Sequence, residues 1–235
     1  MASEIHKGRI PVGFRPARQS VKDPLGRLSR ALTVLCAAGI VGACQISNIK
    51  DNSGLKQARS SGEASVVFGR LKWVENGTEV QLGKGMFGTF VVPELLRMDD
   101  NYRATGELDN NGYFAWQLPP GIYVMDTVTY RGHGRSYFIF PKAVFLVADK
   151  RKTYYVGTLR FEVSLKEGPF TPELGEVKSR VEDREQQDLA AIAKILEMAP
   201  SVDEKSLIIK VGGLPQNIRT MDDYYKAKEL LKGFH

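Results

Sequence analysis

The stretch TYYVGTLRFEVSL, residues 153–165, alternates apolar and polar side chains along most of its length. Its apolar face consists of Tyr155, Leu159, Phe161, Val163 and Leu165. The opposite face consists of Thr158, Arg160, Glu162 and Ser164. A period of two is typical of a β-strand with one face against a core and the other in water. The stretch therefore predicts a strand of a sheet that is buried on one side.

Six further runs of the same kind lie upstream, separated by residues that favour turns. They are ASVVFGRLKWV (64–74), MFGTFVV (86–92), GYFAWQL (112–118), GIYVMDTVTYR (121–131), RSYFIF (135–140) and KAVFLVA (142–148). The pair Asn76-Gly77 follows the first run, and Asn-Gly tolerates the positive φ that a tight hairpin turn needs. Short strands at this spacing predict a mainly β protein in which residues 64–165 form an antiparallel β-sandwich of about seven strands.

Residues 166–235 are more charged, and two helices are expected among them. In DREQQDLAAIAKILEMAP (183–200), the apolar residues Leu189, Ile192 and Leu196 recur at helical spacing. A second helix is expected in TMDDYYKAKELLKG (220–233), with Thr220 as its N-cap. We therefore treat residues 166–235 as a C-terminal helical extension. The apolar stripe of the first helix must be buried either on the sandwich of the same chain or on a partner protein.

Basic side chains are concentrated in the first 43 residues. The 235-residue chain has a formal net charge of +6, and residues 1–43 contribute +5 of it, from seven basic and two acidic side chains. The rest of the chain is nearly neutral, at +1. Since a clustered basic surface is the electrostatic footprint of nucleic-acid binding, this distribution argues against a nucleic-acid partner.

The same segment has the layout of an export signal. A positively charged region is followed by an apolar run at 31–41 and by the small residues Gly42 and Ala43. A helix needs about 20 apolar residues to cross a bilayer, so this run is too short for a permanent span. We therefore predict that residues 1–43 are a signal peptide.

The end of the signal, Val41-Gly42-Ala43-Cys44, resembles the lipobox of bacterial lipoproteins. The resemblance implies cleavage between Ala43 and Cys44 and a lipid on the sulfur of Cys44. An ordinary secretory signal or an uncleaved anchor, with Cys44 incidental, is the alternative. The other cysteine, Cys36, would leave with the signal, and a single unpaired thiol would be unusual in an exported protein.

Residues 44–63 are polar and show neither a helical nor a strand period, so we expect a flexible tether. In the lipoproteins that the lipobox resembles, Asp directly after the cysteine favours retention in the inner membrane. Here that position is Gln45. The resemblance therefore implies a cell-envelope protein held to the membrane by its lipid, on the periplasmic side of the outer membrane where the organism has one.

The central stretch LDNNGYFAWQLPPGIYVM (108–125) resembles the prealbumin-like and carboxypeptidase-regulatory-like sandwich modules. The stretch FLVADKRKTYYVGTLRF (145–161) looks like their closing strands. Such modules are rarely catalytic. The resemblance therefore implies a protein that is not an enzyme, needs no cofactor, and binds or scaffolds another envelope component, either a protein or a glycan.

One enzymatic group among prealbumin-like folds, the hydroxyisourate hydrolases, uses histidines, an arginine and a C-terminal Tyr-Arg-Gly-Ser. This chain has YRGHGRS at 130–136, but internally and with His133 as its histidine. A hydrolase acting around the His133 loop is therefore an alternative function. The other interpretation is an exposed histidine in a glycine-flanked loop between two strands.

Two further patterns have a structural and a functional interpretation. ELDNNG (107–112) resembles the front of a calcium loop, but Leu118 stands where the bidentate acid belongs, so a hairpin turn is expected and no metal site is predicted. Trp73 and Trp116 could form an aromatic platform for a glycan, although such residues are more often part of the core.

Overall fold

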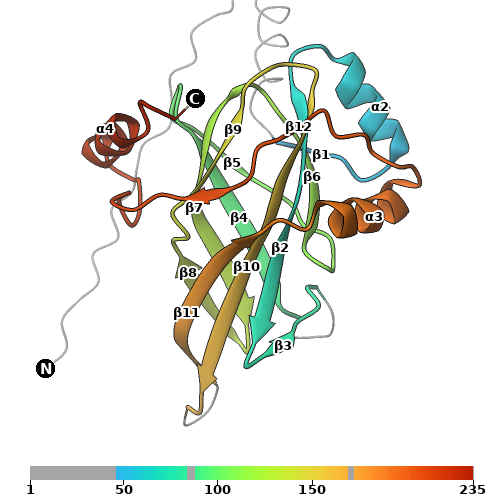
Figure 1. Cartoon of the computed structure of the whole chain (residues 1–235). Coiled ribbons are helices and arrows are strands. Elements are labelled where there is room, and N and C mark those ends of the chain that lie inside the picture. The colour runs from blue at the N-terminus through green and yellow to red at the C-terminus, as the bar shows by residue number, and fades with distance from the viewer. Residues whose placement is uncertain (1–45, 84–87, 169–171, 235) are drawn as a thin grey trace, which may run out of the picture. The chain divides into compact units, whose positions relative to one another are not determined.

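The structure is a computed structural model that describes residues 46–83, 88–168 and 172–234. These residues belong to one of the two units into which the chain divides, Cys44–His235. Strand accounts for 47% and helix for 17% of the structure, which confirms a mainly β fold. The described strands form two sheets, and three helices lie outside them (Figure 1).

The first sheet has the strand order β1-β6-β2-β10-β11, with β3 paired to β2 and β12 paired to β10. The bounds of its strands are β1 (Ser47–Asn48), β2 (Ser65–Glu75), β3 (Thr78–Glu79), β6 (Tyr113–Leu118), β10 (Thr153–Lys166), β11 (Glu173–Glu182) and β12 (Glu204–Lys205). The turn between β2 and β3 contains Asn76 and Gly77, both with positive φ, as the Asn-Gly pair predicts.

The second sheet has the order β13-β9-β7-β4-β5, with β8 paired to β7. The bounds of its strands are β4 (Phe90–Arg97), β5 (Tyr102–Thr105), β7 (Gly121–Gly132), β8 (Arg135–Ile139), β9 (Ala143–Val147) and β13 (Ile209–Lys210). β8 and β9 both pair with β7, β9 along its first half and β8 along its second.

The two sheets share one hydrophobic core. Alternate residues of β2, β6 and β10 in the first sheet pack with residues of β4, β7 and β9 in the second. Its largest fully buried side chains include Trp73, Trp116, Tyr130, Tyr154, Phe145 and Phe161. Burial of such large aromatic and aliphatic surfaces is the main favourable contribution to folding.

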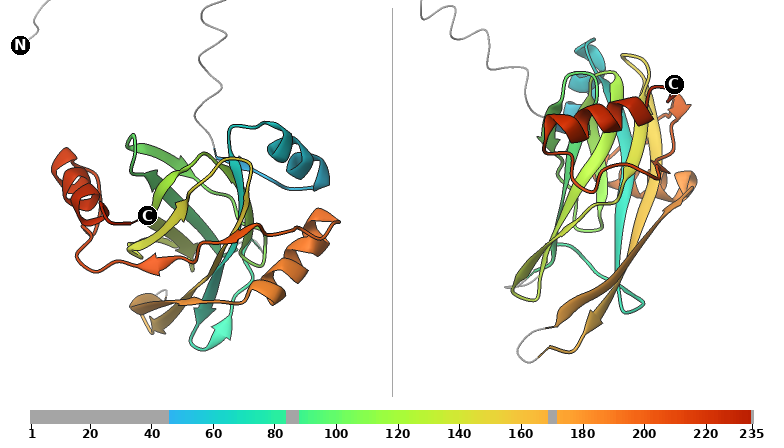
Figure 2. Two further views of the ribbon diagram at one scale, coloured as in Figure 1. Left: turned by 45° about the horizontal axis from the view of Figure 1, so that its top comes forward. Right: turned by 90° about the vertical axis from the view of Figure 1, so that its left-hand side faces the viewer.

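Helices cover the outer sides of both sheets (Figure 2). α2 (Asn52–Ser60) and α3 (Glu185–Leu196) pack on the first sheet, and α4 (Met221–Leu230) packs on the second. Ile192 and Leu196 of α3 are buried against the sheet, so this stripe packs within the chain. No helix in the described ranges is long and apolar enough to span a membrane.

The expected antiparallel sandwich of about seven strands is not confirmed in that form. Two pairs are parallel, β2 with β10 and β10 with β12. Thirteen strands are present in the described residues, and several of them have only two residues. The alternating pattern predicts which face of a strand is buried, but it does not specify the neighbouring strand or its direction.

The expected flexible tether at 44–63 is wrong for the residues that are described. β1 pairs with β6, and α2 begins at an Asp51 side chain that accepts a hydrogen bond from Gly54 N at 2.8 Å. Leu55 and Ala58 of this helix are buried against the first sheet. A helix of nine residues with so few buried positions is too short to produce a clear period.

The expected boundary between a sandwich ending at 165 and a helical extension is also wrong. β10 continues directly into a hairpin with β11, in which Thr158 pairs with Glu182. β11 is the edge strand of the sheet, and charged residues alternate with partly buried ones along it. Charges on an edge strand hinder pairing with other chains. They also make the stretch look like a charged loop, so its sequence does not predict a strand.

Candidate functional site

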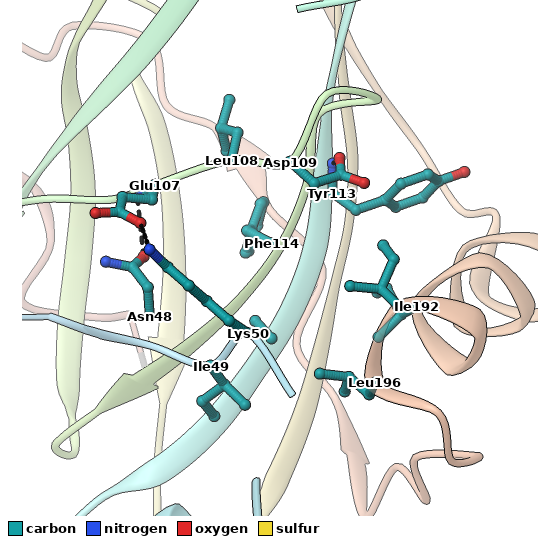
Figure 3. A pocket seen from close by; sticks show the side chains of 12 residues that line it. Asn48, Ile49, Lys50, Glu107, Leu108, Asp109, Tyr113, Phe114, Ile192 and Leu196 are labelled. Carbon is teal, nitrogen blue, oxygen red and sulfur yellow. Dashed lines mark hydrogen bonds and ion pairs between the residues drawn. The ribbon is translucent and has the colours of Figure 1, made fainter. Parts of the chain in front are cut away.

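Apolar side chains line a groove between β1, β6, the loop before β6, and α3 (Figure 3). We call it the α3 groove. Its volume is about 260 Å³. The apolar lining consists of Ile49, Leu108, Phe114, Ala115, Ile192, Ile195 and Leu196. The polar residues around it are Asn48, Lys50, Glu107, Asp109 and Tyr113.

The wall formed by α3 is fixed through a buried carboxylate. Asp188 accepts hydrogen bonds from Tyr155 Oη at 2.7 Å and from Thr158 Oγ1 at 2.5 Å, both on β10. Tyr155 Oη also accepts a hydrogen bond from Arg184 N at the start of the helix, at 3.0 Å. Burial, and then the contact with Asp188, raise the pKa of Tyr155 well above its usual value. This network holds the first turn of α3 against the sheet.

The opposite wall is the loop that leads into β6. Asp109 Oδ1 accepts hydrogen bonds from Asn111 N at 2.8 Å and from Tyr113 N at 2.7 Å. A carboxylate used in this way closes a turn, which agrees with the hairpin interpretation of ELDNNG. The Phe114 ring stacks on Trp116 with centroids 3.7 Å apart, so the aromatic floor is held in place.

Polar groups stand at the rim. Lys50 Nζ lies 2.7 Å from Glu107 Oε2, and both side chains are largely exposed (Figure 3). Glu107 N donates a hydrogen bond to Asn48 Oδ1 at 2.9 Å. An exposed ion pair contributes little to stability, so both partners are free to bind another charged group at small cost.

The groove can bury a small apolar group beside the exposed Lys50–Glu107 ion pair. Pockets for drug-sized ligands usually occupy roughly 300–1,000 Å³. The α3 groove is slightly smaller, which suits a single large side chain or a short alkyl or aryl group. Its residues come from three separate segments of the sequence, and only the helical stripe at 189–196 gave a local signal for one wall.

The two tryptophans do not form an exposed aromatic platform. Trp73 is 1% exposed and Trp116 is 0% exposed. Trp73 stacks on Tyr130 at a centroid distance of 4.5 Å inside the core. The core interpretation is therefore correct for both residues, and the platform for a glycan is wrong because flat rings can stack on a sugar only where they reach the surface.

His133 lies in the turn between β7 and β8, with φ at +52°. Its Nε2 is 3.0 Å from Glu75 Oε2 at the end of β2. Tyr130 Oη donates a hydrogen bond to the other oxygen, Glu75 Oε1, at 2.5 Å. Because Tyr130 also stacks on Trp73, the structure brings Trp73 and His133 into one cluster, whereas Trp116 lies in the core behind Phe114.

The Glu75–Tyr130–His133 cluster is joined by hydrogen bonds and is only partly accessible to solvent. Burial, and then the hydrogen bond to Glu75, raise the pKa of Tyr130 well above its usual value, so the phenol stays neutral. His133 is about one-third exposed, and its ring is oriented by a carboxylate, as in a general base.

Ala43 and Cys44 lie outside the described residues, which begin at Ile46. Within the described part of the chain, no group of three or more potential metal-ligating side chains lies close together.

No protein-family model matches the chain, and no curated protein or solved structure matches it significantly.

Proposed function

We propose that this chain is an exported lipoprotein whose folded part is a non-catalytic binding or scaffolding module of the cell envelope. The observation that carries the binding role is the α3 groove, a preformed apolar site with an exposed ion pair at its rim. A few polar groups beside an apolar cavity are what orient a ligand in most binding sites.

The anchor is supported by the sequence around Cys44. In this proposal, the signal is cut between Ala43 and Cys44, and the sulfur of Cys44 carries the lipid. Two acyl chains give stable anchoring where one gives only marginal binding. Because Gln45 and not Asp follows Cys44, the resemblance favours the outer membrane, facing the periplasm, in an organism with two membranes.

We propose further that the two packed sheets are a sandwich of the prealbumin-like or carboxypeptidase-regulatory-like type. The support is the order of turn, aromatic strand, Pro-Pro-Gly turn and Tyr-containing strand at 108–125, which corresponds to β6 and β7. The helices and the β11 edge strand are additions to that core. In this view the α3 groove exists because α3 was added beside the β1–β6 edge.

The ligand is an envelope component with an apolar group that fits the groove, most simply a protein segment with one large apolar side chain. Ile195 of α3 lines the groove and is 38% exposed, so changing it disturbs the core little. Ile195→Glu would place a carboxylate in the apolar lining and should reduce binding at least about tenfold, since burying an unpaired charge costs several kcal/mol. Lys194→Glu on the exposed side is the matched control.

The experiment is a pull-down from detergent-solubilised envelopes with wild type, Ile195→Glu and Lys194→Glu. The proposal predicts a component that co-purifies with wild type and with Lys194→Glu, but not with Ile195→Glu. Equal recovery of the component with all three proteins would show that the α3 groove is not the binding site. A circular dichroism spectrum for each variant establishes that the fold is unchanged.

The hydrolase alternative remains a second candidate, because Glu75 orients the ring of His133. It is tested by replacing His133 and Arg131 with alanine and screening hydrolytic activity. Loss of an activity with the fold intact would replace the binding proposal with an enzymatic one.

A further inference from the structure

The chain is held in place from the first described residue onward. Ile46 is 6% exposed and belongs to the core shared by both sheets. Ser47 pairs with Gln117 of β6. Only Gln45 separates Cys44 from Ile46. Since an extended chain spans at most about 3.6 Å per residue, the Cα atoms of Cys44 and Ile46 lie within about 7 Å of each other.

This constraint identifies the end of the fold nearest to Cys44. β1 runs antiparallel to β6, so the start of β1 lies beside the end of β6. Leu118 at the end of β6 pairs with Ser65 at the start of β2, and Thr153 at the start of β10 pairs with Val66. The segments next to this point are therefore 61–64, 119–120 and 148–152, which we call the proximal end. Gln117 Nε2 donates a hydrogen bond to Ser61 Oγ at 2.7 Å, which joins the first segment to β6.

The segments 61–64 and 148–152 are also linked to each other. Arg151 N donates a hydrogen bond to Ala64 O at 3.1 Å, and Lys150 Nζ lies 2.8 Å from Glu63 Oε2. The segments 61–64 and 148–152 therefore form one connected surface.

We infer that the proximal end rests on the phospholipid headgroups of the membrane, with the fold held against the bilayer and not suspended above it. The inference rests on the lipid at Cys44 proposed above. A flexible tether of eighteen residues would span roughly 25 Å. The upper limit of about 7 Å set by the chain is similar to the thickness of one headgroup layer, roughly 5–8 Å.

The proximal end presents basic side chains to the headgroups. Lys150, Arg151 and Lys152 are consecutive, and the first two are exposed. Three acidic side chains pair with them, in the ion pairs Lys150–Glu63, Lys152–Asp149 and Lys152–Glu204. The cluster is therefore balanced in charge, and the exposed Lys150 and Arg151 are the groups that can contact lipid phosphates.

If the proximal end rests on the headgroups, the other end of the two sheets points away from the membrane. β10 begins at the proximal end with Thr153 and ends at Lys166, after fourteen residues. At roughly 3.3 Å per residue, this strand alone spans more than about 40 Å. The β10–β11 hairpin and the turn between β2 and β3 lie at this distal end (Figure 1).

The test uses the mature lipoprotein purified from cells and reconstituted in vesicles of phosphatidylethanolamine and phosphatidylglycerol. With Cys36 removed and Cys44 lipidated, no free thiol remains, so one engineered cysteine can be labelled with a fluorophore. Lys150→Cys reports on the proximal end, and the exposed Glu167→Cys reports on the distal end. Quenching by lipids with a spin label on the headgroup is measured for both.

We expect the label at 150 to be quenched at least about twofold and the label at 167 to be unaffected, because quenching requires near contact. Insertion of eighteen Gly and Ser residues between Gln45 and Ile46 adds a span of roughly 25 Å and should largely relieve the quenching at 150. Equal quenching at both labels, or no effect of the insertion, would overturn the orientation while leaving the anchor intact. Protein that does not float with the vesicles would overturn the anchor itself, and the orientation with it.

Discussion

Replacing Asp188 with alanine should loosen α3 and destabilise the whole fold. Asp188 is fully buried and accepts hydrogen bonds from the hydroxyl groups of Tyr155 and Thr158. Hydrogen bonds to a charged group contribute about 1.5–3 kcal/mol each, and the substitution would leave both hydroxyl groups without this acceptor. A buried carboxylate also has a desolvation cost, and Asp188 Oδ1 has no hydrogen-bond partner in the described residues, which offsets part of the loss.

The free energy of unfolding of Asp188→Ala should therefore fall by about 3 kcal/mol. Urea denaturation followed by circular dichroism measures it. The exposed Gln186→Ala on the same helix is the control, with an expected change below about 0.5 kcal/mol. Hydrogen exchange should become faster in α3 before it does in β10, because the helix loses its attachment to the sheet. A loss below about 1 kcal/mol for Asp188→Ala would show that this network does not hold α3.

Two further predictions concern other parts of the fold. Leu55→Ala in α2 should lower the free energy of unfolding by about 2–5 kcal/mol, as in a packed core, whereas the exposed Lys56→Ala should change it little. Equal, small effects of the two substitutions in urea denaturation would support a flexible tether and contradict the packing of α2. Burial raises the pKa of Tyr123, Tyr130 and Tyr155. Above about pH 10 the folded state therefore keeps protons that the unfolded state loses. The free energy of unfolding should then fall by about 1.4 kcal/mol per pH unit for each tyrosine. Tyrosinate absorbance of these residues should then appear together with unfolding, and a smooth titration without unfolding would contradict their burial.

The strands could be predicted where one face is buried and the other is wet. The alternation predicts the core face of β10 correctly from Leu159 to Val163, and the Asn76-Gly77 turn follows β2. It is wrong for Tyr155 and Thr158, which both lie on the other face and are buried under α3, because the register shifts between these two residues. Both features depend on local chemistry, the period of a half-buried strand and the positive φ of Asn-Gly. The predicted cap of the last helix is also present, since Thr220 Oγ1 accepts a hydrogen bond from Asp223 N at 3.1 Å.

The elements that could not be predicted depend on distant partners. α2 is stabilised by packing on β2, and its own sequence provides only Leu55 and Ala58 as buried positions. The parallel pairing of β2 with β10 joins residues nearly ninety positions apart. The α3 groove likewise joins segments near residues 49, 108–115 and 192–196, and none of them alone has the composition of a binding site.

The intact mass of the protein isolated from membranes tests the central claim most directly. The account predicts a mature chain that begins at Cys44 and has the added mass of a diacylglyceryl group, with or without a further acyl chain. A chain that keeps residues before Cys44, or one that begins at Cys44 without acyl mass, would contradict the lipid anchor and the membrane orientation derived from it.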